Sequence, residues 1–109
     1  MSEVIDIFRV LDFMRDHSEA YAKAKAERQY LENFRKTVKA QQMKKHLDMP
    51  VSAQEREAYA SDEIQDVDKA IRIATEEEAK LYWLLSSAQV KADVWRSLSA
   101  SQRAEGRNV

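Results

Sequence analysis

The sequence predicts an all-α protein, a long antiparallel helical hairpin that assembles as a dimeric or higher helical bundle. The 109 residues include one glycine and one proline, and turns and strands depend on both. Hydrophobic residues make up 44 % of the chain, which is too many for a disordered one. At this length we expect a single helical domain, residues 1–109.

The first helix is predicted at about residues 3–46, with Ser2 as its N-cap. Its apolar residues recur at intervals of three and four, as on one face of a helix. They are Val4, Ile7, Leu11, Met14, Tyr21, Ala24, Leu31, Phe34 and Val38. As an alternative, the polar sequence at 16–18 breaks this helix and gives three helices.

Pro50 marks the connection, at about 47–51, because the residue before a proline avoids helical backbone. Directly after it, Ser52 and Glu55 have the spacing of a capping box. We therefore expect the second helix at about 52–104.

The second helix also has an alternative start and an end signal. Ser61 precedes two acidic residues, a pattern that begins a helix and leaves 52–60 as a separate short helix. Gly106 is placed like the C′ residue that follows a helix, which predicts an end near 103–105.

The clearest pattern in the chain is an apolar row on the second helix, which we call the seam. Its residues alternate steps of three and four over almost five heptads. They are Ile64, Val67, Ile71, Ala74, Leu81, Leu85, Ala88, Ala92 and Trp95, with Glu78 as the one polar interruption. A polar group on a seam fixes register, and we expect a lysine of the first helix opposite Glu78.

Residues 79–98 are the stretch around which we expect the chain to be organised. Both tryptophans lie there, and apolar side chains extend well beyond the seam. Because a helix with more than one apolar stripe needs more than one neighbour, this predicts self-association or binding of another protein. The predicted interface comprises Phe8, Leu11, Leu81, Trp83, Leu84, Leu85, Val94, Trp95 and Leu98.

Opposite charges flank the predicted turn. Residues 33–47 hold five basic residues and no acidic one, whereas residues 52–68 hold six acidic residues and one arginine. Folding about Pro50 lays these blocks side by side, which sets orientation more than stability. The basic block also suggests an alternative function, contact with DNA or RNA phosphates. The residues of this alternative are Arg35, Lys36, Lys39, Lys44, Lys45, Arg96 and Arg103.

No residues form a catalytic, metal-binding or nucleotide-binding motif, so we expect no enzyme, no metal and no cofactor. The adjacent carboxylates at 76–78 point about 100° apart on a helix, so one metal cannot collect all three. His17 and His46 stand alone, without the partners that catalysis requires.

Composition also limits the cellular compartments and the classes of partner that we expect for this protein. The net charge of −1 gives no general attraction to nucleic acid or to an anionic membrane. The chain has no cysteine, which fits a reducing compartment. Its longest apolar run is far short of the roughly 20 residues that cross a bilayer. We therefore expect a cytoplasmic protein without a membrane segment.

The segment Glu77–Arg107, EEAKLYWLLSSAQVKADVWRSLSASQRAEGR, resembles small uncharacterised helical proteins of bacteriophages and prophages. In those proteins a C-terminal helix of the form W…AQ…VWRS…RAEGR recurs, often encoded in the early region beside recombination or replication genes. The resemblance covers about the last third of the chain. It implies a phage origin, the host cell cytoplasm and an accessory role around DNA metabolism, and it supplies no catalytic residues.

The predicted function is therefore that of a non-enzymatic, self-associating helical protein that binds another protein. The resemblance adds that it acts as a phage-encoded accessory or modulator of DNA metabolism. The alternative is a DNA- or RNA-binding accessory factor that uses the basic segments named above.

Overall fold

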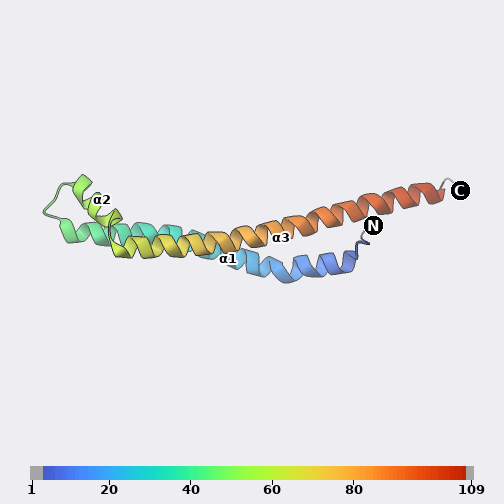
Figure 1. The fold of residues 1–109 in the computed structure, drawn as a ribbon, viewed down its shortest axis with the longest axis horizontal. Coiled ribbons are helices and arrows are strands. Elements are labelled where there is room, and N and C mark those ends of the chain that lie inside the picture. Colours follow the sequence, from blue (N-terminus) through green and yellow to red (C-terminus); the bar gives the residue numbers. More distant parts are fainter. Residues whose placement is uncertain (1–3, 108–109) are drawn as a thin grey trace. The chain divides into compact units, whose positions relative to one another are not determined.

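A computed structural model describes residues 4–107, and almost all of them are helical (Figure 1). The elements are α1 (Ile7–Met43), the short 3₁₀ helix η1 (Lys44–His46), α2 (Val51–Tyr59) and α3 (Asp62–Arg107). No residue between 4 and 107 lies in a strand. The predicted all-α class is confirmed.

The start of α1 is set by Asp6. Its carboxylate accepts hydrogen bonds from the backbone N–H groups of Phe8, at 3.1 Å, and Arg9, at 3.3 Å. These are two of the donors that the first turn of a helix leaves unpaired. The predicted start near residue 3 is therefore too early, and the predicted cap Ser2 lies outside the described residues.

The alternative break at 16–18 does not occur, because α1 continues through these residues. The ring of His17 stacks on that of Phe13 with centroids 4.0 Å apart, and its Nδ1 lies 2.8 Å from the carbonyl oxygen of Phe13. The hydroxyl of Ser18 donates a hydrogen bond to the carbonyl of Met14. Local bonds within the helix therefore satisfy the polar side chains that suggested a break.

The connection predicted at 47–51 ends one residue earlier, since α2 begins directly after Pro50. The N–H of Gln54 donates to the carbonyl of Pro50 at 3.0 Å, which closes the first turn of α2. Ser52 is already inside that turn, and α2 has no side-chain cap. The predicted capping box at Ser52 is wrong for this reason.

The alternative start at Ser61 is confirmed, and with it the separate short helix predicted at 52–60. The Ser61 hydroxyl accepts a hydrogen bond from the N–H of Ile64 at 3.3 Å. Asp62 and Glu63 place negative charge in the first turn of α3, where the helix dipole favours it. The second predicted helix is therefore divided into α2 and α3.

The end of α3 lies beyond the predicted 103–105. The helix extends to Arg107 and includes Gly106. No described residue has a positive φ, so Gly106 does not adopt the left-handed conformation through which a C′ glycine ends a helix. The predicted role of Gly106 is wrong.

The chain forms two compact units. Unit 2, Lys23–Glu78, contains the second part of α1, η1, α2 and the first part of α3. Unit 1 contains the remaining parts of α1 and α3, of which residues 4–22 and 79–107 are described. Each long helix therefore contributes a segment to both units.

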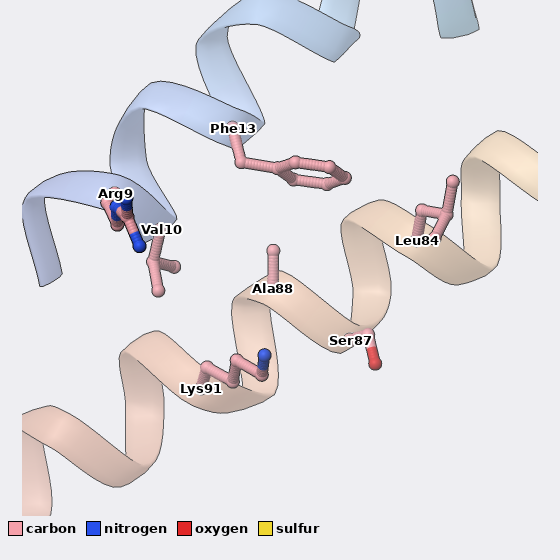
Figure 2. A pocket seen from close by; sticks show the side chains of 7 residues that line it. All are labelled: Arg9, Val10, Phe13, Leu84, Ser87, Ala88 and Lys91. Carbon is pink, nitrogen blue, oxygen red and sulfur yellow. The ribbon is translucent and has the colours of Figure 1, made fainter. Parts of the chain in front are cut away.

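Within each unit the segments of α1 and α3 are antiparallel. In unit 2 the ion pairs join Arg28 and Arg35 of α1 to Glu78 and Asp68 of α3, and Lys45 of η1 to Glu63. The number of the α3 partner therefore falls as the chain runs from α1 into η1. In unit 1, Phe13 faces Ala88 (Figure 2), and the ring of Tyr21 lies 6.4 Å from that of Tyr82. These pairings confirm the predicted helical hairpin.

The enclosed core lies in unit 2. Val38, Ile64 and Val67 are buried together, with Ile71 packed against them, and Ala58 of α2 is fully buried. Three helices meet here (Figure 1), so side chains can be covered from several directions.

The stretch 79–98, which holds both tryptophans, is largely exposed. Of its residues only Leu81 and Ala88 are buried. Among its described residues unit 1 brings together two helix segments, and two helices cover only the stripe along which they touch.

The seam of α3 is buried or half-buried at every predicted position from Ile64 to Ala92, and Trp95 is 38 % exposed. On α1 the predicted row is partly wrong, because Leu11 and Phe34 are exposed. The row that α1 buries or half-buries comprises Ile7, Val10, Met14, His17, Tyr21, Ala24, Arg28, Leu31, Arg35, Val38 and Gln42. The prediction contained six of these residues, but it counted only apolar residues and so missed the four polar ones, His17, Arg28, Arg35 and Gln42.

We expect Ile64→Ala to lower the free energy of unfolding by about 2–5 kcal/mol, because Ile64 is 1 % exposed and its loss leaves a cavity in the core. Leu47→Ala is the control for an equal loss of side-chain volume, since Leu47 is 72 % exposed, and should change it by less than about 1 kcal/mol. Urea denaturation followed by circular dichroism measures both. Equal effects would contradict the position of the core.

Candidate functional site

Arg28 and Glu78 form an ion pair across the seam. The Nε and Nη2 atoms of Arg28 donate hydrogen bonds to the two carboxylate oxygens of Glu78, and the bond from Nη2 is 3.1 Å long. Nη1 of Arg28 donates to Glu32 at 3.1 Å. The hydrogen bond from Arg28 holds the pKa of Glu78 below its usual range, and the one from Glu78 raises the pKa of Arg28.

Glu78 was predicted to face a lysine, but its partner is Arg28, and the difference has a physical reason. The planar guanidinium matches a carboxylate with two parallel hydrogen bonds, which an ammonium group does not offer. A bidentate pair on a seam sets the register of the two helices.

The oppositely charged blocks lie side by side, as predicted. Arg35 donates to Asp68 at 2.6 Å, and Lys39 lies 3.5 Å from Glu55 of α2. The Arg35 guanidinium and the Lys39 ammonium lie 5.5 Å and 4.7 Å from the centre of the Tyr59 ring. Ion pairs and cation–π contacts together tie α2 to α1.

These contacts occupy most of the residues proposed to bind nucleic acid. Arg35, Lys39 and Lys45 pair with carboxylates across the hairpin. Arg96 pairs with Asp93 on its own helix. Lys36, Lys44 and Arg103 are exposed. A phosphate would have to compete with these carboxylates for the same cations, so the arrangement does not favour this alternative.

The predicted interface residues do not form one patch. Leu81 is buried and Leu85 half-buried, so both belong to the seam. Leu11 and Trp95 line a shallow groove in unit 1, together with Ile7 and Met14. The remaining predicted residues are exposed. They are Phe8, Trp83, Leu84, Val94 and Leu98.

A second row on α3, which we call the outer stripe, faces away from the seam. Its residues again follow steps of three and four. They are Trp83, Ser87, Val90, Val94, Leu98 and Ser101. All are exposed and none is charged, although 34 % of the chain is charged. The predicted interface did not include Val90, although Val90 lies seven residues after Trp83 and therefore on the same face of the helix.

Unit 1 contains a groove between α1 and α3 of about 340 Å³. Figure 2 shows Val10 and Phe13 directed from α1 towards α3, where Ala88 faces them and Leu84 lies farther along. Arg9, Ser87 and Lys91 complete the lining. Because the charged residues here are cations, we call this the basic-edged groove.

Unit 2 contains a groove of similar size, about 370 Å³, also between α1 and α3. Its apolar lining comprises Ala24, Leu31, Ala70, Ile73 and Ala74. Its two charged residues are Glu27 and Glu77. We call it the acidic-edged groove.

The described residues form neither a metal-binding cluster nor a helix that could cross a membrane. Within residues 4–107, no three side chains of the metal-binding types come together as a metal site would require. None of the helices in that range combines the length and apolar character that a membrane crossing needs.

Comparison of the chain with protein-family models, with curated proteins and with solved structures gave no match. The resemblance of Glu77–Arg107 to phage proteins stays a prediction from the sequence.

The Arg28–Glu78 pair predicts a pH dependence of stability. Since the pKa of Glu78 lies below its ordinary 4.5, the pair contributes above that pH and its contribution is lost as pH falls through the lowered value. Glu78→Gln should therefore lower the melting temperature at pH 7, and the difference from wild type should shrink at about pH 3. Thermal melts by circular dichroism measure this.

The control is Glu76→Gln, which changes an exposed carboxylate two residues away. It should leave the melting temperature nearly unchanged at both pH values. A Glu78→Gln difference that stays constant with pH would contradict the proposed role of the pair.

Proposed function

We propose that this chain is a non-enzymatic helical protein that associates with itself and binds a second protein through the outer stripe of α3. The outer stripe is the single observation that carries the proposal. Contiguous exposed apolar residues are uncommon on a monomer and mark interaction sites. Trp83, which is 69 % exposed, is of the residue type most enriched among energetically dominant interface residues.

The dimensions of the outer stripe suit a helical partner. From Trp83 to Ser101 it extends over about 27 Å, or five turns. Full burial of a valine or leucine side chain contributes roughly 1.5–3 kcal/mol, so Val90, Val94 and Leu98 supply a substantial driving force. The serines among them are small, which allows a partner backbone to approach closely.

The biological setting enters the proposal through the resemblance alone. The outer stripe lies within Glu77–Arg107, the segment that resembles phage proteins of the early region. We therefore propose that the second protein belongs to phage or host DNA metabolism in the host cytoplasm, where this chain acts as an accessory or modulator.

Self-association is tested by sedimentation equilibrium at micromolar concentration. The surplus apolar surface of unit 1 predicts at least the mass of a dimer. A mass of 12.7 kDa throughout, the value for a single chain, would contradict it.

Binding through the outer stripe is tested with Val90→Lys/Val94→Lys. Lysines at these exposed positions leave the seam intact and place charge on the surface that the partner must bury. Affinity capture from nuclease-treated extract of the natural host should retain a protein with wild type and lose it with the variant.

The matched control is Gln89→Lys/Ala100→Lys, which adds two lysines at exposed positions of α3 away from the stripe. It should capture the same protein as wild type. Identical capture by all three proteins, as judged by mass spectrometry, would rule out the outer stripe as the binding surface.

A further inference from the structure

The two grooves have opposite charges and similar sizes. We propose that self-association docks unit 1 of one copy onto unit 2 of a second copy, with the basic-edged groove against the acidic-edged groove. This inference rests on the self-association in the proposed function and names the surfaces that perform it.

The apolar residues of each groove provide a driving force for docking. In unit 1 the floor is formed by Val10, Phe13, Leu84 and Ala88, and in unit 2 by alanines with Leu31 and Ile73. Each groove lies between only two helix segments, so its floor stays open to water. Packing two helix pairs face to face covers such floors, as in four-helix bundles.

The charged residues determine which faces meet. Arg9 and Lys91 are exposed in unit 1, and Glu27 and Glu77 are exposed in unit 2. None of the four forms an ion pair with another described residue. By contrast, many other charged residues are paired, including Arg28 and Arg35 of α1.

Contact between unlike grooves brings these cations to these carboxylates. Contact between like grooves would bring equal charges together, at a cost that grows as water is excluded. The charges therefore favour unlike docking and disfavour the alternatives.

A second copy of this chain is the occupant that fits this pattern. Each copy carries both grooves, of about 340 and 370 Å³, so each copy can offer either groove to a second copy. Trp83, Val90 and Val94 line neither groove. Docking through the grooves therefore leaves most of the outer stripe for the second protein.

Charge reversal tests the proposal with full-length chains. Arg9→Glu/Lys91→Glu makes both grooves acidic, and Glu27→Lys/Glu77→Lys makes both basic. Each variant alone should dissociate at least about tenfold more readily than wild type, since the attractive contacts become repulsive. An equimolar mixture of the two should recover the wild-type association, because every contact then joins unlike grooves. Sedimentation velocity measures the association constants, and native mass spectrometry identifies the mixed dimer.

The matched control is Lys36→Glu/Lys44→Glu, which changes net charge as the first variant does but lies in neither groove. It should associate like wild type, and circular dichroism should show all variants to be helical. Unchanged association of either reversal variant, or a mixture that fails to recover, overturns the groove proposal while self-association stands. A monomeric wild type overturns self-association and the groove proposal together.

Discussion

Arg28 of α1 faces Glu78 on the seam of α3, and the register of α1 on α3 depends on the bidentate hydrogen bonds between them. The residues one heptad before and after Glu78 are Ile71 and Leu85. A slip of one heptad would place the Arg28 guanidinium against an aliphatic side chain and leave its charge unpaired, which is costly wherever water is partly excluded. In the register observed, Arg35 also meets Asp68. Apolar seam residues alone would discriminate poorly between neighbouring registers, because a heptad repeat resembles itself after seven residues.

The number of helices that meet differs between the units, and this number decides what each unit can bury. In unit 2 the short helix α2 brings Tyr59 against α1 and buries its own Ala58, beside the core of Val38, Ile64 and Val67. α2 exists as a separate element because Ser61 begins a new helix. In unit 1 no third helix is present among the described residues. A pair of segments buries one stripe of each and leaves grooves along its sides.

This difference explains why the surfaces available for binding are apolar. Unit 1 carries both tryptophans but has one helix contact along which to bury them, so Trp83 stays on the outside of α3. The outer stripe and the grooves satisfy different requirements. The stripe is without charge along its length and suits a partner that brings its own apolar face. The grooves have charged edges of opposite sign, which suits a partner that carries the complementary charges.

The sequence by itself determined the helical class, the reversal at Pro50, the seam of α3 and the pairing of the charged blocks. Each depends on local composition or on helical periodicity, which act between residues near in the chain. It also indicated three of the four exposed apolar residues of the outer stripe, Trp83, Val94 and Leu98, because surplus apolar residues on a helix predict a second neighbour. Only the tertiary structure decided that Asp6 rather than Ser2 caps α1, that Arg28 is the partner of Glu78, and that the core lies beside α2 rather than at 79–98. The polar members of the α1 row and the two grooves were also invisible in the sequence. Which side chains are covered depends on how many helices meet at one place, and that number is a property of the assembled fold.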